Sequence, residues 1–217
     1  MTYEDFLSQE RLSKFRITDQ DSKEKILSRY LWNLELCSTF YVPLHLLEVG
    51  IRNSVDQSLS KEFGENWLFE PGILGSRESE SVAKALKELN KRNEKQIKGK
   101  VIAELMFGFW VSLFYKNYEN SPILRTTNQN EIFWPKCIKS VFPNAPKSMQ
   151  TRKAMSARLE DIKRLRNRVF HHESLIIVSD LYMVHNEICE VIKWISDDVD
   201  VLFICDRVKD VIAKRPL

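Results

Sequence analysis

The segment that most restricts the possible folds is VIAELMFGFWVSLFY, residues 101–115. Apolar side chains occupy most of its circumference when the residues are projected at about 100° per residue. A helix that is apolar on nearly all sides is stable only where other helices surround it. We therefore expect residues 101–115 to form the central helix of a helical protein.

The composition favours the same fold class. Six Gly and seven Pro among 217 residues are about half the usual share of helix-breaking residues. A hydrophobic content of 43% excludes a disordered chain, and the scarcity of Gly excludes collagen. We expect an all-α fold in one domain over residues 1–217, with about 20 N-terminal and about 15 C-terminal residues at its periphery.

Helical periodicity extends over most of the chain, without internal repeats or long linkers. Pro43 stands where a helix can start, and Gly64 stands where that helix can end. The helices expected in addition to the central one are residues 4–14, 22–39, 43–63, 79–98, 148–169 and 180–198, with shorter elements in 133–142 and 201–217.

Charge and cysteine content indicate a cytoplasmic protein with a local binding surface. The net charge of +3 neither requires nor excludes a polyanionic partner, so a nucleic-acid surface must be local. The cysteines are widely spaced and form no C-x-x-C pair, which favours reduced thiols in the cytoplasm. No segment reaches the roughly 18 uncharged apolar residues of a membrane span, and the polar N-terminus does not resemble a signal peptide. We therefore predict a soluble protein that does not enter a membrane. The four cysteines are Cys37, Cys137, Cys189 and Cys205.

Two arginines lie on the apolar face of the helix predicted near residues 154–170. Projection places Arg158 and Arg166 inside an apolar arc of roughly 160°. An arginine on an apolar face must be paired or must bind a ligand, because an unpaired buried guanidinium is strongly disfavoured. The apolar residues of this arc are Ala154, Met155, Leu159, Ile162, Leu165, Val169 and Phe170.

The densest group of polar residues follows at the end of this helix, with Arg166, Asn167, His171, His172 and Glu173. A metal-free site that cleaves phosphodiesters needs a cation for the phosphoryl oxygens and an imidazole that exchanges protons near neutral pH. In an unbroken helix His171 lies about 140° around the axis from Arg166. The two can converge only if the helix ends between them or if a second subunit supplies part of the site.

Two other interpretations of this segment remain open. Arg166 can be a core arginine paired to a carboxylate, with the histidines at the helix C-terminus, where the dipole favours imidazolium. A metal site made of His171, His172 and either Glu173 or His185 is less favoured, because adjacent histidines point in different directions. We predict no metal and no cofactor.

A second polar pair is predicted in the helix that follows Pro43. Glu48 projects into the apolar stripe of that helix, and Arg52 follows one turn later. The two residues can form a structural ion pair, or they can orient Arg166 and His171 as supporting residues. His185 lies on another apolar stripe and is expected to be a core histidine.

At these residues the sequence resembles the Abi-like family of bacterial abortive-infection proteins, of the AbiD/AbiF type, which belongs to the HEPN superfamily. The resemblance covers most of the chain. The matching stretches are YLWNLELCSTFYVPLHLLEVGIRNSV at 30–55, the segment 101–113 with Gly108-Phe109-Trp110, and IKRLRNRVFHHESL at 162–175.

The resemblance implies an all-α HEPN-type helical bundle with additional helices, which forms a homodimer with a composite active site. It implies a metal-independent endoribonuclease of phage defence that acts on RNA, with an antitoxin or other regulator that the sequence does not identify. Arg166 and His171 match the catalytic Arg and His, and Asn167 matches the polar residue after the Arg. Phe170 stands where relatives frequently carry a small residue. The alternative is a non-catalytic HEPN module that binds RNA, a nucleotide or a partner protein.

Overall fold

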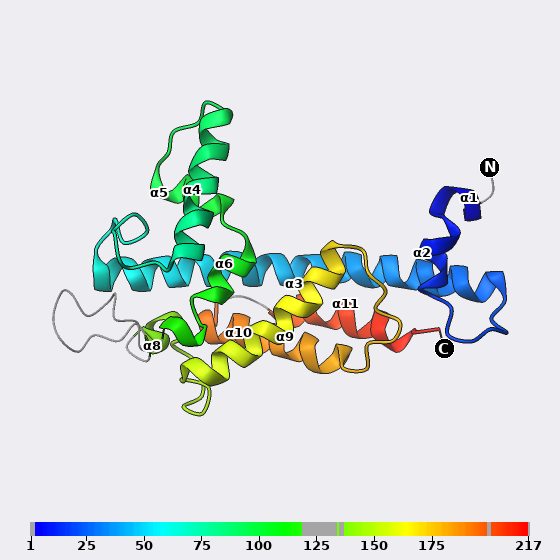
Figure 1. Ribbon diagram of the computed structural model, residues 1–217. Helices are drawn as coiled ribbons and strands as arrows, with labels where there is room; N and C mark the ends of the chain where they lie inside the picture. The colour runs from blue at the N-terminus through cyan, green and yellow to red at the C-terminus, as the bar shows by residue number, and fades with distance from the viewer. Residues whose placement is uncertain (1–2, 119–133, 135–136, 199–200, 217) are drawn as a thin grey trace. The chain divides into compact units, whose positions relative to one another are not determined.

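The computed structural model describes residues 3–118, 134, 137–198 and 201–216 (Figure 1). All secondary structure of these residues is helical, which confirms the all-α class. The predicted element at 133–142 falls partly outside the described residues. The elements are α1 (Tyr3–Leu7), α2 (Gln9–Ser13), α3 (Lys23–Phe63), α4 (Ser76–Lys91), α5 (Lys98–Glu104), α6 (Phe107–Ser112), the 3₁₀ helix η1 (Lys116–Tyr118), α8 (Ile138–Val141), α9 (Arg152–Phe170), α10 (Leu181–Ile195) and α11 (Val201–Ala213).

The chain divides into two compact units, and one boundary between them falls inside α3. The first unit comprises Met1–Leu46, Arg164–Glu190 and Asp200–Leu217. The second unit comprises Leu47–Lys163 and Val191–Val199. The end of α9, with its polar cluster, therefore belongs to the first unit.

The prediction of separate helices before and after Pro43 is wrong, because α3 continues through this proline. A proline inside a helix removes one backbone hydrogen bond and costs about 3 kcal/mol. The apolar side chains on either side of it are at most 2% exposed and continue one stripe without interruption. Their burial offsets the cost of the proline. These side chains are Leu36, Phe40, Leu44 and Leu47.

The predicted central helix is divided into α5 and α6. Leu105 has extended backbone angles (φ −74°, ψ 123°), and its carbonyl accepts a hydrogen bond from Trp110 Nε1 at 3.4 Å. Met106, at the start of α6, is 73% exposed, whereas Phe107, Phe109 and Trp110 are buried. The predicted burial therefore holds for most of α6, where only Gly108 is exposed, but the prediction of a single helix over residues 101–115 is wrong.

Left-handed backbone angles account for two further differences. Ser8 (φ 65°) separates α1 from α2, and its Oγ accepts a hydrogen bond from the Arg11 amide. Asn93 (φ 54°) follows α4, where the Glu94 amide donates to the Leu89 carbonyl at 2.9 Å. This hydrogen bond closes a helix C-terminus several residues before the predicted end at residue 98.

The core of the first unit joins the first half of α3 to α10 and α11 (Figure 1). Trp32 Nε1 donates a hydrogen bond to the Val211 carbonyl at 2.7 Å, and the Arg215 guanidinium lies over the Trp32 ring. Phe40 packs edge-on against His185, with ring centroids 6.1 Å apart. Helix α3 is therefore fixed against the two C-terminal helices, and it can position residues that contact it from α9.

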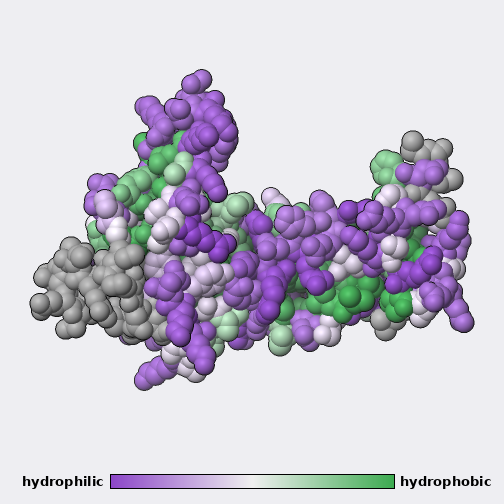
Figure 2. Space-filling model, in the orientation of Figure 1, coloured by the Kyte–Doolittle hydropathy of each residue, from purple (hydrophilic) through white to green (hydrophobic). Residues whose placement is uncertain are grey.

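The second unit is built around the apolar stripe of the later part of α3, and polar side chains anchor its loops. Asp56 accepts a hydrogen bond from Trp67 Nε1 at 2.8 Å and forms an ion pair with Lys98 at 3.2 Å. Trp134 Nε1 donates to the Leu113 carbonyl at 2.7 Å. Figure 2 shows that polar residues cover most of the viewed face and that hydrophobic residues gather in separate patches.

Two observations bear on the predicted compartment. Among the described residues, α3 is the one helix whose length and composition would allow it to cross a membrane, although 44% of its most apolar window is buried inside the protein. Core helices of soluble proteins meet the same criterion. Cys37 and Cys137 carry free thiols, but Cys189 is disulfide-bonded, so the prediction of reduced cysteines fails for Cys189.

Candidate functional site

Helix α9 ends in a turn closed by two backbone hydrogen bonds. The Glu173 amide donates to the Arg168 carbonyl at 2.8 Å, and the His172 amide donates to the Val169 carbonyl at 3.2 Å. His172 has φ 55°, in the left-handed region that glycine usually occupies at this position. Histidine adopts this conformation more readily than most residues. The chain therefore leaves the helix immediately after Phe170 and exposes both histidines.

Side chains from two other helices of the same unit hold this turn. Arg11 Nη2 donates to the His172 carbonyl at 3.1 Å. Asn33 is 2% exposed; its Nδ2 donates to the Glu173 carbonyl at 3.3 Å, and its Oδ1 accepts from the Leu175 amide at 2.8 Å. These three contacts give the turn a defined position, although sequence reasoning identified neither Arg11 nor Asn33. The signal for Asn33 is an amide within the apolar segment YLWNLELC.

The two arginines of the apolar arc lie against aromatic rings. The Arg166 side chain is half-buried, and its guanidinium carbon is 4.3 Å from the centroid of the Phe170 ring, one turn later. Arg158, in the second unit, lies 5.4 Å from the centroid of the Trp194 ring. A guanidinium on an aromatic face is stabilised electrostatically by the ring. Phe170 therefore supports Arg166.

His171 and Asn167 are exposed at the end of α9. The His171 amide still donates to the Asn167 carbonyl at 2.9 Å, so the backbone at His171 keeps its helical hydrogen bond. Within the described ranges, the His171 side chain makes no hydrogen bond. Arg166 and His171 both lie at the end of α9, and helical geometry continued to residue 171 places them about 140° apart around the axis. The interpretation of the histidines as residues of the helix C-terminus agrees with this geometry.

Glu48 and Arg52 belong to the second unit, and both are half-buried on α3. The two interpretations of this pair, a structural ion pair and support of Arg166 and His171, both stay predictions.

His185 lies in the core of the first unit. It is fully buried, and its Nε2 is 3.6 Å from the Cys189 Sγ. Burial lowers the pKa of His185 from 6.5 to about 4, with a smaller contribution from Lys209 on α11 and an opposing one from Asp206. The imidazole is therefore neutral near pH 7, as expected of a core histidine.

The candidate metal site has no geometric support among the residues described. Among the side chains that the structure describes, no three from His, Cys, Asp or Glu form a group that could hold a metal ion.

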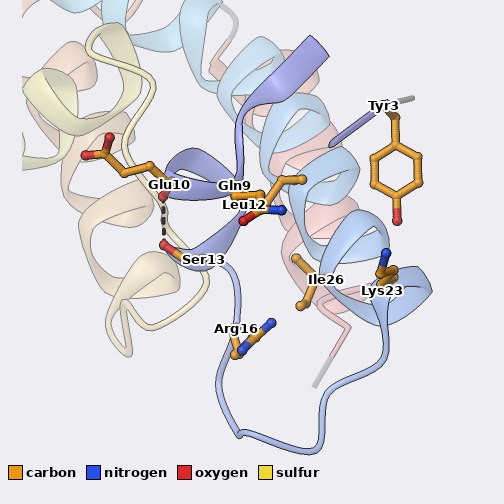
Figure 3. Close-up of a pocket in the computed structure, with 8 residues that line it drawn as sticks. All are labelled: Tyr3, Gln9, Glu10, Leu12, Ser13, Arg16, Lys23 and Ile26. Carbon is orange, nitrogen blue, oxygen red and sulfur yellow. Dashed lines mark hydrogen bonds between the residues drawn. The ribbon is translucent and has the colours of Figure 1, made fainter. Parts of the chain in front are cut away.

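A cavity of about 440 Å³ lies in the first unit beside α1, α2 and the start of α3 (Figure 3). In Figure 3 the Tyr3 hydroxyl and the Lys23 amino group point toward the same space. None of the predicted site residues lines this cavity, so it is separate from the end of α9. Its lining residues are Tyr3, Gln9, Glu10, Leu12, Ser13, Arg16, Lys23 and Ile26.

Sequence reasoning also missed two aromatic side chains beside Phe170. Tyr41 packs against Phe170 with ring centroids 5.7 Å apart, and His45 stacks on Tyr41 at 5.9 Å. Both residues are exposed on α3. The available signal was their spacing of four residues, outside the apolar stripe of the same helix.

Comparison with protein-family models, with curated proteins and with solved structures found no match to this chain.

Proposed function

We propose that the chain is a metal-independent endoribonuclease of the HEPN type that acts in bacterial phage defence. The observation that supports this most strongly is the presence, at one helix end, of a guanidinium that stacks on Phe170 and of an exposed imidazole that makes no hydrogen bond in the described structure. A cation that binds a phosphodiester and a side chain that exchanges protons near pH 7 are the two parts that metal-free RNA cleavage requires. The assignment to phage defence rests on the sequence resemblance.

In the proposed reaction, Arg166 binds the nonbridging oxygens of the scissile phosphate and stabilises the charge of the phosphorane. One His171 removes the proton from the ribose 2′-hydroxyl, and the 2′-oxygen forms a bond to phosphorus. The bond from phosphorus to the 5′-oxygen breaks, and that oxygen receives a proton from a second imidazole. The products are a 2′,3′-cyclic phosphate and a free 5′-hydroxyl, so protons balance and no metal is consumed or required.

We propose a homodimer because Arg166 and His171 of one chain lie on different sides of α9. Two copies would bring the Arg166 of one chain toward the His171 of the other in a composite cleft. His172, Asn167, Glu48 and Arg52 are proposed as supporting residues. The same separation favours the alternative, in which the α9 terminus binds RNA, a nucleotide or a protein without cleaving it.

The test is cleavage of single-stranded RNA by the full-length chain in the presence of EDTA. We expect defined fragments that end in cyclic phosphates, and a decrease of about 10²- to 10⁴-fold for His171→Ala, because positioned proton transfer contributes that much. Arg166→Ala should lose a comparable factor through lost charge stabilisation. Lys153→Ala is the matched control, since Lys153 is an exposed cation on the same helix.

Three outcomes would contradict the proposal in different ways. Equal cleavage by His171→Ala and wild type would remove His171 from the mechanism. Cleavage that EDTA abolishes would point to a metal enzyme. Binding of RNA without cleavage would favour the binding module.

A further inference from the structure

Four side chains of the first unit form a continuous stack beside the α9 terminus, which we name the ring stack: His45, Tyr41, Phe170 and Arg166. The His45 and Tyr41 rings are nearly parallel, with an interplanar angle of 9° and a centroid distance of 5.9 Å. Tyr41 and Phe170 are 5.7 Å apart at 34°, and the Arg166 guanidinium covers Phe170 at 4.3 Å. The ring stack therefore leads from α3 directly to the proposed phosphate-binding arginine.

Exposure separates the ring stack from the core. Tyr41 is 53% exposed, whereas the adjacent Phe40 is completely buried against His185 and fills the core. His45 is also exposed. An aromatic surface held in place by its neighbours loses little conformational entropy when another flat ring stacks on it. The ring stack thus has the properties of a binding surface rather than those of packing.

The cation at one end of the ring stack favours an anionic occupant. This cation is Arg166 alone, because Arg164 and Arg168 lie about 200° around α9 from it. Arg168 donates to the Ser174 carbonyl at 3.4 Å and lies 4.0 Å from Glu173. Exposed aromatic rings next to guanidinium groups are the combination by which proteins bind single-stranded nucleic acid. An acidic nucleic-acid backbone fits this surface better than an apolar helix would.

We infer that Tyr41 and His45 stack an unpaired base of the RNA whose phosphate Arg166 binds. This inference rests on the proposed function and adds the substrate class: single-stranded RNA, with a base flanking the scissile phosphate held on the ring stack. Stacking on a ring face is tolerant of base identity, so the ring stack would select unpaired over paired RNA without reading sequence.

Binding of a labelled single-stranded RNA oligonucleotide tests the inference. It is measured with full-length protein that carries His171→Ala, so that cleavage does not disturb the equilibrium. We expect Tyr41→Ala to raise Kd by about 5- to 150-fold, because stacking contributes about 1–3 kcal/mol per base. Tyr41→Phe should retain the affinity because it keeps the ring. Val42→Ala is the matched control, since Val42 is the next residue on α3 and is 50% exposed.

Three results would overturn the inference. The first is equal affinity of Tyr41→Ala and the control. The second is an equal loss of affinity by Tyr41→Ala for double-stranded RNA, whose bases are not available for stacking. The third is a change in oligomeric state on Tyr41→Ala, measured by sedimentation, which would assign the surface to a second copy of the chain.

Cleavage by the protein with His171 intact separates this inference from the proposed function. If that protein cleaves RNA in EDTA but the affinity does not depend on Tyr41, the ring stack fails and the nuclease stands. If it binds RNA through Tyr41 without cleaving it, the ring stack stands and the nuclease fails.

Discussion

Arg29 and Arg166 lie in the same unit, but their surroundings differ in kind. Arg29 is 1% exposed, forms an ion pair with Asp21 at 2.5 Å, and donates to the carbonyls of Phe15 at 3.1 Å and Pro216 at 3.3 Å. Arg166 is half-buried on one aromatic ring, and the exposed His171 follows five residues later.

The difference shows what each arginine is suited to do. The guanidinium of Arg29 holds the pKa of the Asp21 carboxyl far below its usual range, with help from the Thr18 and Ile17 amides. A charge engaged on all sides has no capacity left for a ligand, so it joins separate parts of the chain. Arg166 is half-buried on the Phe170 ring at the end of α9, and the His171 side chain is exposed there.

The largest expected effect on stability is that of Arg29→Met. Removal of one partner from a buried ion pair typically costs about 3–5 kcal/mol, because the other charge remains buried. Urea denaturation measures this loss, and the folded fraction should keep its RNA cleavage rate. Arg16→Met is the control, since Arg16 is exposed in the adjacent segment. An equal loss of unfolding free energy in Arg29→Met and Arg16→Met would show that Arg29 has no special structural role, and the contrast with Arg166 would fail.

His185, like Arg29, is buried, and its burial should make the stability of the protein depend on pH. Its pKa is about 4 in the folded protein and 6.5 when unfolded, so between these values only the unfolded chain takes up the proton. Stability should therefore fall as the pH decreases from 6.5 to 4, by up to about 3 kcal/mol. Urea denaturation at several pH values measures this slope. His185→Leu should flatten the slope, and an unchanged slope would exclude His185 as its cause.

Asn33 connects the buried core of the first unit to the exposed turn after α9, because its buried side chain forms hydrogen bonds with the backbone of that turn. Asn33→Ala leaves the Leu175 amide without its acceptor, which should cost about 1–3 kcal/mol of unfolding free energy. It should also lower RNA cleavage, since the position of His171 depends on this turn. Asn53→Ala, an exposed amide on the same helix, is the control. An unchanged cleavage rate in Asn33→Ala would show that the position of the turn does not depend on the hydrogen bonds of Asn33.

The smallest expected effect is a gain. His172→Gly removes a side chain from a left-handed position, which should raise stability by at most about 1 kcal/mol. Thermal denaturation measures the gain, with Asn93→Gly as a second left-handed position outside the site. If His172 supports RNA cleavage as proposed, the cleavage rate of His172→Gly should decrease while its stability rises. A loss of stability would show that the imidazole of His172 supports the fold.

The sequence was sufficient to predict some of these features and not others. The apolar arc of α9 has a local period, so the partial burial of Arg166 and the helix end near residue 170 could be predicted. Pro43 was misjudged because a local rule on proline competes with long-range burial of Phe40 and Leu44. The contact between Asn33 and the α9 turn joins residues 140 positions apart, and no local pattern encodes it.

The ring stack was missed for a related reason. Tyr41 and His45 are noticeable only once Phe170 lies beside them, since an aromatic pair at a spacing of four residues is common on helices. Arg29 was missed because periodicity assigns a basic residue to the surface unless its partners are known. Packing between distant segments determines each of these features, whereas helix content follows from composition and period.

The proline inside α3 has a consequence for backbone dynamics. Because Pro43 has no amide hydrogen, the carbonyl of Thr39 lacks its usual partner in the very turns that carry Tyr41 and His45. Helices bend most easily at such a gap. The spacing between the Tyr41 and His45 rings can therefore widen through a small hinge in α3, without unfolding either flanking segment. Hydrogen exchange of the amides around residue 43 would be the direct measure of this hinge.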